Sequence, residues 1–360
     1  MSETQQQIEL LLNNATTYTS IELFAGAGGM ALGMEKSGIE HLLLNDFDRY
    51  ATQTLKKNRP QWNVIYGDVA TIDFTPYKGV DILTGGFPCQ AFSYAGKKRG
   101  MEDTRGTLFY EFARALKESE PKVFLAENVK GLKSHDGGRT LATMVEVFES
   151  MGYEVLEPTV LKGIHYNVPQ KRERIFIVGI KKEYARDVTF KWPKPSSKIY
   201  NLQDALRKGE LFDSNVPLSK GQAYPEKKKK VLDLVPAGGY WRDLPLELQK
   251  EYMMKSFYLG GGKTGIARRI AWDEPSLTLT CSPAQKQTER CHPDETRPFT
   301  VREYARIQTF PDSWKFEGSM TNQYKQIGNA VPVNLAYAVG MSLVKLLDDM
   351  KKVNNFGYIK

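Results

Sequence analysis

Cysteine and histidine are scarce in this sequence, and long apolar runs are missing from it. The chain of 360 residues contains 3 cysteines and 4 histidines. Cys89, Cys281 and Cys291 are too few and too scattered for a disulfide framework or a structural zinc site. We find no apolar run near the roughly 20 residues of a membrane helix, and no charged-then-apolar leader. These absences favour a protein of the reducing cytoplasm that has no metal and no membrane partner.

The composition is that of a soluble globular protein with an excess of positive charge. Hydrophobic residues make up 41% and charged residues 26% of the chain, and the formal net charge is +8. Such a charge suits a polyanionic partner, although many basic proteins bind none. The length allows one large domain, or one domain together with a smaller one.

The first candidate ligand site is a glycine-rich turn between a strand and a helix. Residues 18–24 predict a strand and residues 30–36 predict a helix. Such a turn lets backbone N–H groups and the helix N-terminus face a ligand. The spacing is not the GxGxxG of dinucleotide-binding folds, and no P-loop lysine follows, so this signal alone is weak. The turn residues are Phe24, Ala25, Gly26, Gly28 and Gly29.

Acidic residues end or follow the next two predicted strands. Asp46 lies roughly 20 residues past the glycines, where an acid can accept ribose hydroxyls. Phe47 beside it can lie on an adenine face, and Asp68 follows the predicted strand 64–66. Each aspartate could instead cap a helix or lie in a solvated loop, which is the commoner role of a lone aspartate. Three such signals in successive strand–helix units favour a cofactor site.

The stretch 80–93 carries the candidate nucleophile. An apolar run ends at two glycines, and Pro88 then stiffens the turn that presents Cys89. Open α/β sheets place their chemistry at the carboxyl ends of strands, whereas a cysteine judged by position alone is more often a buried core residue. The glycine- and cation-rich loop 94–106 is long enough to be a moving lid or a binding segment.

Two further sets of residues are candidates for catalysis. Glu127 ends the apolar run 123–126, where a carboxylate is unfavourable unless it is paired or functional. Gln170, Arg172 and Arg174 alternate into a predicted strand, so we expect them to share one face.

Beyond about residue 195 the regular alternation of strands and helices stops. Segment 196–296 is richer in glycine, proline, lysine and isolated aromatics. We therefore predict an α/β domain over 1–195 and 320–360, and a smaller mixed domain over 196–319. Within the smaller domain, Thr300 and Glu303 predict a capping box at a helix start.

Taken together, these segments resemble the cytosine-C5 DNA methyltransferase family, of the prokaryotic restriction–modification type. The resemblance covers nearly all of residues 18–195 and 297–345, in the family's order. Its blocks are Phe24-x-Gly-x-Gly28, Pro88-Cys89-Gln90, Glu127-Asn128-Val129, Gln170-x-Arg172-x-Arg174 and Gly328-Asn329. The joint match is very specific, although each block alone is weak to moderate. It implies a Rossmann-like α/β fold with a doubly wound, mostly parallel sheet that binds S-adenosylmethionine.

The resemblance also implies which residues bind that cofactor. The family usually has glutamate and then tryptophan where Asp46 and Phe47 stand, so we expect altered affinity and retained binding. The implied cofactor-binding residues are Phe24, Ala25, Gly26, Gly28, Gly29, Asp46, Phe47, Asp68, Val69, Pro88, Leu108, Asn329 and Ala330.

By the same resemblance, the reaction takes place on a cytosine flipped out of duplex DNA. Carbon 5 of cytosine is too electron-poor to take a methyl group unaided, so the Cys89 thiolate first adds at carbon 6. Glu127 protonates or hydrogen-bonds nitrogen 3, Arg174 holds the carbonyl oxygen at carbon 2, and Arg172 or Arg174 favours the thiolate. The expected DNA-binding residues are Gln90, Ser93, Lys97, Lys98, Arg99, Arg268 and Arg269, with Gln285 and Gln287 as further candidate base readers.

Three other functions stay open on the sequence. One branch of the family modifies tRNA, and a non-catalytic DNA-binding regulator could use the same scaffold. A nicotinamide oxidoreductase shares the fold class but fails at the glycine spacing. The favoured interpretation is a cytoplasmic, monomeric enzyme acting on double-stranded DNA, with a restriction endonuclease as its genetic but not necessarily physical partner.

Overall fold

The computed structural model describes residues 17–88 and 108–357, with side chains as far as Val353. Its chain divides into two compact units. The first contains residues 1–162, 173–194 and 336–360, and the second contains residues 163–172 and 195–335. The change of pattern near residue 195 therefore coincides with a boundary between the units.

Two segments belong to the smaller unit although the sequence prediction placed them in the larger one. Within the smaller unit, β8 (Gln170–Lys171) pairs with β10 (Ser276–Leu277). Helix α11 (Met320–Asn329) packs on α10 (Val301–Ile307), and the rings of Tyr304 and Tyr324 lie 5.0 Å apart. These contacts, which sequence spacing does not reveal, assign 163–172 and 320–335 to the smaller unit.

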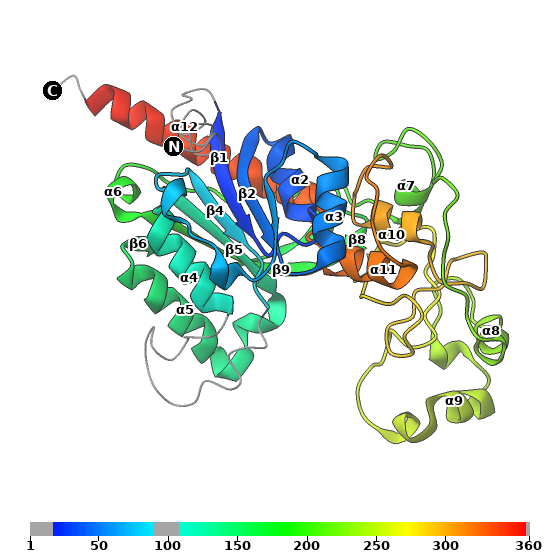
Figure 1. Ribbon diagram of the computed structural model, residues 1–360. Coiled ribbons are helices and arrows are strands. Elements are labelled where there is room, and N and C mark those ends of the chain that lie inside the picture. The colour runs from blue at the N-terminus through cyan, green and yellow to red at the C-terminus, as the bar shows by residue number, and fades with distance from the viewer. Residues whose placement is uncertain (1–16, 89–107, 358–360) are drawn as a thin grey trace. The chain divides into compact units, whose positions relative to one another are not determined.

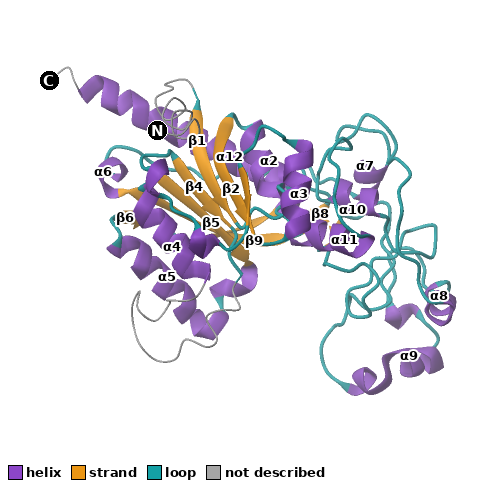
Figure 2. Cartoon of the chain, in the orientation of Figure 1, coloured by secondary structure: helices purple, strands orange, loops and turns teal. Residues whose placement is uncertain are grey.

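The larger unit is built on one eight-stranded sheet (Figures 1 and 2). Its strand order is β3-β2-β1-β4-β5-β9-β6, with β7 also paired to β9. Neighbours from β3 to β5 are parallel, whereas β9 is antiparallel to β5, β6 and β7. The strands are β1 (Tyr18–Leu23), β2 (Ile39–Asp46), β3 (Val64–Tyr66), β4 (Ile82–Gly85), β5 (Val123–Val129), β6 (Tyr153–Val155), β7 (Thr159–Lys162) and β9 (Glu173–Lys181).

Helices cover both faces of this sheet, which makes it doubly wound. Figure 1 shows α4 and α5 in front of the sheet and α12 behind it. The helices are α2 (Gly29–Lys36), α3 (Arg49–Asn58), α4 (Leu108–Ser119), α5 (Arg139–Ser150), α6 (Lys182–Ala185) and α12 (Val333–Gly357). The predicted α/β class with a mostly parallel sheet is therefore confirmed.

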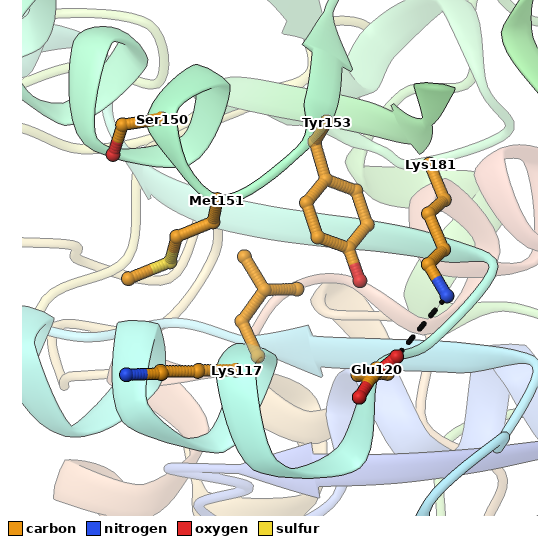
Figure 3. Close-up of a pocket in the computed structure, with 7 residues that line it drawn as sticks. Lys117, Glu120, Ser150, Met151, Tyr153 and Lys181 are labelled. Atoms are coloured by element: carbon orange, nitrogen blue, oxygen red, sulfur yellow. Dashed lines mark hydrogen bonds and ion pairs between the residues drawn. The ribbon is translucent and has the colours of Figure 1, made fainter. Parts of the chain in front are cut away.

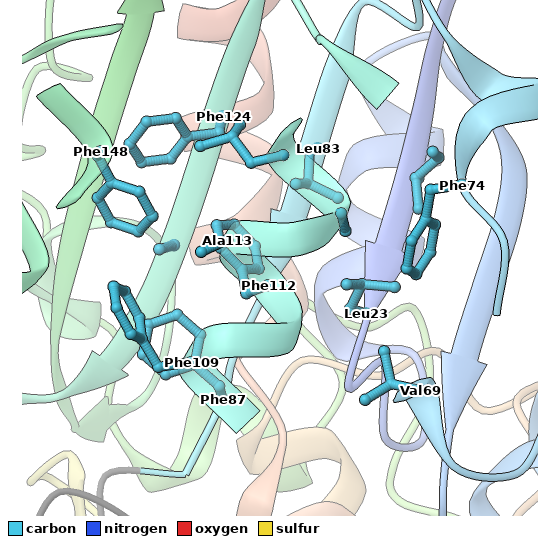
Figure 4. Close-up of a cluster of buried hydrophobic side chains, with 14 of the residues drawn as sticks. Leu23, Val69, Phe74, Leu83, Phe87, Phe109, Phe112, Ala113, Phe124 and Phe148 are labelled. Atoms are coloured by element: carbon cyan, nitrogen blue, oxygen red, sulfur yellow. The ribbon is translucent and has the colours of Figure 1, made fainter. Parts of the chain in front are cut away.

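An aromatic cluster fixes α4 and α5 on the sheet (Figure 4). Phe109 and Phe112 lie one helical turn apart on α4, so both point to the same face. The rings of Phe148 on α5 and Phe124 on β5 have centroids 4.4 Å apart, and Phe109 lies 5.3 Å from Phe148. Burial of such rings stabilises this layer by about 1.5–3 kcal/mol for each side chain.

The smaller unit contains few regular elements and many loops. Its helices are α7 (Leu202–Leu206), α8 (Glu226–Leu232), α9 (Leu246–Met253), α10 and α11. The predicted capping box is confirmed, since the Thr300 hydroxyl accepts from the Glu303 N–H and the Glu303 carboxylate accepts from the Thr300 N–H. A hydrophobic core around Leu232, Trp241 and Ile266 holds α8 and α9 in place.

One helical stretch of the structure has the length and apolar composition of a membrane span, although the sequence contains no continuous apolar run of that length. Met320–Val353 is long and apolar enough by length and composition, and 56% of its most apolar window is buried within the protein. The core helix of a soluble protein has the same properties, so this stretch is weak evidence for a span.

Candidate active site

The carboxyl ends of the central strands bring the predicted site residues to one edge of the sheet. Leu23 pairs with Asn45 and with Gly85, and Gly85 pairs with Ala126. The next residues along these strands are Phe24, Asp46, Gly86 and Glu127. These four positions therefore form one row at the carboxyl ends of the four strands, as expected for open α/β sheets.

The turn between β1 and α2 has a backbone shape that suits a ligand. Phe24, Gly26 and Gly28 all have positive φ angles, of 58°, 54° and 86°. Gly28 caps α2 without a side-chain hydrogen bond, and the first turn of α2 has no acidic residue. No acidic side chain of this helix caps its N-terminus. The N-terminus therefore suits a ligand that carries a negative charge or a hydrogen-bond acceptor.

The two predicted cofactor-binding aspartates, of which Asp46 is the predicted ribose acceptor, have different surroundings. Asp46 accepts hydrogen bonds from the backbone N–H groups of Gly26 and Asp48, each at 2.7 Å. A carboxylate has about four acceptor sites, so Asp46 can fix the glycine turn and still receive a hydroxyl. Asp68 instead accepts from the Ala70 N–H at 3.0 Å and caps a short helix, which is the alternative that the sequence left open. Phe47 is 74% exposed, which suits a stacking face.

Sequence reasoning missed Glu22, a carboxyl within β1 that is fully buried. Burial raises its pKa to about 8, and hydrogen bonds from Thr84 and the Ala31 backbone oppose this shift. The Thr84 hydroxyl lies 3.4 Å from one carboxyl oxygen. An acidic residue inside the apolar run Ser20-Ile21-Glu22-Leu23 was the available signal, because an unpaired charge is not stable in such a position.

Glu127 and Arg174 form a close, mostly buried ion pair in the larger unit. Arg174 Nε lies 2.8 Å from Glu127 Oε1, and the two side chains are 12% and 10% exposed. Strand pairing positions the pair, since β9 runs antiparallel to β5 and Arg174 lies opposite Val129. A mostly buried carboxyl beside a guanidinium can form a hydrogen bond with a planar heterocycle or transfer a proton to it.

The segment that leads to Cys89 is held against this pair. The Asn128 amide donates to the Phe87 carbonyl at 2.7 Å. A Cβ atom at Gly86 would lie only 2.8 Å from Glu127 Oε2, so glycine is needed for this close approach. Pro88 is exposed at the end of the described segment, whereas Leu108 is half-buried where α4 begins. Val69 is packed in the hydrophobic core.

Six predicted residues lie outside the described part of the chain and stay predictions. They are Cys89, Gln90, Ser93, Lys97, Lys98 and Arg99.

Arg172 makes structural contacts in the smaller unit that the alternation did not predict. The expected strand is interrupted at Arg172, between β8 and β9. Its side chain is fully buried within the smaller unit and donates to the carbonyls of Leu279, at 3.2 Å, and Gly328, at 2.9 Å. Gln170 likewise bonds Gln308 and the Leu279 N–H. These contacts show that Arg172 holds the Leu279 and Gly328 segments together, and its catalytic role stays a prediction.

Asn329, the predicted cofactor residue of the smaller unit, is exposed, and Ala330 beside it is buried. A Cβ atom at Gly328 would lie 2.4 Å from the Thr280 carbonyl, so this glycine allows the two segments to touch. The Cys281 thiol donates to Asn329 Oδ1 at 3.0 Å. This bond fixes the amide so that its NH₂ group points away from Cys281.

The two predicted base-reading arginines are bound within the smaller unit. Arg269 is 5% exposed and donates to the carbonyls of Val235, Leu232 and His292, at 2.7, 2.7 and 3.0 Å. Arg268 pairs with Glu274 at 2.6 Å. A loop-rich unit leaves many carbonyls without a helix or strand partner, and buried guanidinium groups supply the donors. Carbonyl groups therefore occupy the Arg269 guanidinium and Glu274 occupies that of Arg268. Base reading by either arginine stays a prediction that these contacts disfavour.

A cavity of ≈ 480 Å³ in the larger unit lies away from the strand ends (Figure 3). It is lined by the C-terminal turns of α4 and α5, by Tyr153 of β6, and by Lys181, which bonds Glu120 at 3.2 Å. Glu120 precedes β5, so the cavity adjoins the opposite end of that strand from Glu127. Among residues 17–88 and 108–357, no group of three His, Cys, Asp or Glu side chains could hold a metal ion.

Comparisons with known proteins identify relatives over nearly the whole chain. The family model described as C-5 cytosine-specific DNA methylase matches residues 18–345. The Type II methyltransferase M.Eco47II of Escherichia coli is 67% identical over 336 residues, which cover 93% of this chain and 81% of that protein. M.PspPI of Psychrobacter sp. (strain TA137), also named a Type II methyltransferase, is 59% identical over 345 residues, covering 96% and 83%.

A solved structure extends the likeness to the fold. The methyltransferase EhMeth of Entamoeba histolytica is similar with a TM-score of 0.64, covering 92% of this chain and 99% of that one. At 15% identity, this likeness shows the fold alone.

Proposed function

Because the chain belongs to the C-5 cytosine-specific DNA methylase family, we propose that it methylates carbon 5 of cytosine in a specific DNA sequence, with S-adenosylmethionine as donor. The observation that carries this proposal is the Glu127–Arg174 pair, 2.8 Å apart at the strand end that contacts Phe87, two residues before Cys89 in the sequence. The close relatives are named Type II methyltransferases, which favours DNA over tRNA as the substrate and a catalyst over a regulator.

The residues at the sheet edge fit the proposed cofactor. The positive-φ turn at Phe24, Gly26 and Gly28 allows close approach to the N-terminus of α2. Asp46 offers carboxylate oxygens for ribose hydroxyls, and the exposed Phe47 offers a ring for the adenine. When bound, S-adenosylmethionine supplies an electrophilic methyl group. Asn329 and Ala330, which belong to the smaller unit, remain predicted cofactor-binding residues.

The chemistry on the base belongs to residues of the larger unit. The Cys89 thiolate forms a bond to carbon 6, and the carbon 5–carbon 6 electron pair becomes the nucleophile that takes the methyl group. Glu127 donates a hydrogen bond or proton to nitrogen 3, which accepts the charge that the addition places on the ring. Arg174 uses its remaining N–H groups on the carbonyl oxygen at carbon 2. A base then removes the carbon-5 proton, and the sulfur leaves carbon 6 as the carbon 5–carbon 6 double bond forms again.

The biological setting follows the same reasoning. The protein acts in the cytoplasm as a monomer on double-stranded DNA, and the methyl mark protects host DNA from a cognate restriction endonuclease. The +8 net charge supports a polyanionic substrate. Extrusion of the target base from the duplex requires a few kcal/mol, which contacts to the flanking DNA offset.

A direct test compares substrates. The purified protein is incubated with methyl-labelled S-adenosylmethionine and either duplex DNA from an unmethylated host or tRNA. Label in cytosine of DNA supports the proposal. Label in tRNA alone would show that the enzyme belongs to the RNA-modifying branch, and cofactor binding without label in either substrate would favour a regulator.

A further inference from the structure

The burial of Arg269 and the pairing of Arg268 raise the question of which residues of the smaller unit read DNA. Segment 278–290 contains a run of three exposed residues, Gln285, Lys286 and Gln287. All contacts that hold this segment, described below, lie within the smaller unit.

The base of this segment is tied together across its two ends. The hydroxyls of Thr280 and Thr288 lie 3.2 Å apart, and Arg290 donates to the Thr278 carbonyl at 2.8 Å. A turn closes the tip, since the Thr288 N–H donates to the Gln285 carbonyl at 3.0 Å. The tip is therefore built as a closed loop, with its shape set before any ligand arrives.

Buried charge holds the same loop against α8 and α9. Lys228 donates to the Ala284 carbonyl at 2.6 Å and pairs with Glu289 at 2.7 Å. The Glu289 side chain is fully buried and also accepts from the Tyr252 hydroxyl at 2.8 Å. Removal of Lys228 would leave the buried Glu289 carboxylate without its cation, so this pair holds the loop firmly.

The ammonium group of Lys286, at the tip, is bound to α9. Lys286 Nζ donates to the Tyr252 carbonyl at 2.6 Å and lies 4.9 Å from the centre of the Tyr252 ring. The exposed groups on either side of it are the amides of Gln285 and Gln287. An amide carries both donors and an acceptor, which suits base edges, whereas phosphate contacts are made mainly by cations.

We propose that Gln285 and Gln287 read base edges of the recognised DNA sequence. This inference rests on the proposed function and identifies the residues that give it sequence specificity. The rigid backbone of 278–290 presents the two amides, and the base pairs that they contact are discriminated by donor and acceptor pattern in the major groove.

The test begins with bisulfite sequencing of DNA from a host that expresses the wild-type chain, which gives the methylated word. The kcat/KM is then measured on duplexes that carry this word and on a set with one recognised base pair changed at a time. Gln285→Ala and Gln287→Ala are each expected to lower kcat/KM on the full word by roughly 10- to 100-fold. Each is also expected to relax discrimination at one base pair. Gln203→Ala, at an exposed glutamine of α7, is the matched control and leaves the profile unchanged.

Each outcome decides the matter. If both variants discriminate among the changed duplexes as the wild-type chain does, the inference is overturned. An equal loss of kcat/KM on every duplex, together with a smaller salt dependence, would indicate phosphate contacts and would also overturn it. If an alanine variant has a lowered melting temperature, Gln285→Glu and Gln287→Glu repeat the test, since they keep the shape but replace the amide donors. A wild-type chain that labels no cytosine in DNA would instead refute the proposed function.

Discussion

Replacement of Gly86 by alanine should displace the carboxyl of Glu127, the proposed acid catalyst, without altering its chemistry. The new Cβ would lie 2.8 Å from Glu127 Oε2, whereas ordinary contacts begin at 3.4 Å, so the carboxyl must move by about 0.6 Å. Gly86 does not have a positive φ, so alanine does not strain the backbone. A misplacement near 1 Å lowers rates by about 100-fold, so we expect Gly86→Ala to lower kcat roughly 10-fold.

The assay is single-turnover methyl transfer to a duplex that contains the recognised word, with the affinity for S-adenosylmethionine measured in parallel. The expected result is a slower chemical step with nearly unchanged cofactor affinity. Gly131→Ala is the matched control, because a Cβ atom there meets nothing within 4 Å. A Gly86→Ala enzyme that folds normally and transfers methyl groups at the wild-type rate would refute the close packing of this carboxyl against Gly86 as a catalytic requirement.

Three further perturbations test other parts of the molecule. Cys281→Ala removes the donor to Asn329 and should weaken S-adenosylmethionine binding by about 2- to 10-fold, with recovery in Cys281→Ser; equal affinities in titration calorimetry would show that the thiol does not orient the amide. Arg269→Met leaves several buried carbonyls without a donor and should lower the free energy of unfolding by about 3 kcal/mol or more, seen in denaturant melts. An Arg269→Met protein with full stability and a changed recognition word would restore that residue as a base reader. Burial raises the pKa of Glu22 in the folded protein to about 8 from its usual value of 4.5, so the folded protein keeps a proton that the unfolded chain loses between these values. Stability should therefore fall as pH rises through this window and level off above it, by an amount on the order of a few kcal/mol. Glu22→Gln should flatten this slope, and an unchanged slope in the variant would show that another group is responsible.

Sequence patterns predicted the strand ends well because their signals are local. Apolar runs that stop at glycine or an acid marked the ends of β1, β2, β4 and β5, and parallel pairing brings such ends to one edge. The capping box at Thr300 was equally accessible, since it depends on two residues three positions apart.

The remaining features depend on contacts between distant segments. Arg172 and Arg174 look equivalent in a strand pattern, yet the interruption between β8 and β9 sends one into the smaller unit and leaves the other beside Glu127. Arg269 looked like an exposed cation, and only the carbonyls of segments 232–235 and 292–293 explain its burial. Local periodicity carries no information about such partners.

The most direct test of the central claim is a covalent trapping measurement. A duplex with 5-fluorocytosine at the methylated position is incubated with the protein and S-adenosylmethionine, and denaturing electrophoresis detects the protein–DNA adduct. Fluorine blocks the final proton removal, so the account predicts a stable adduct for the wild-type chain and none for Cys89→Ser. An adduct that forms equally well in Cys89→Ser, or methyl transfer at the normal rate by that variant, would contradict the account.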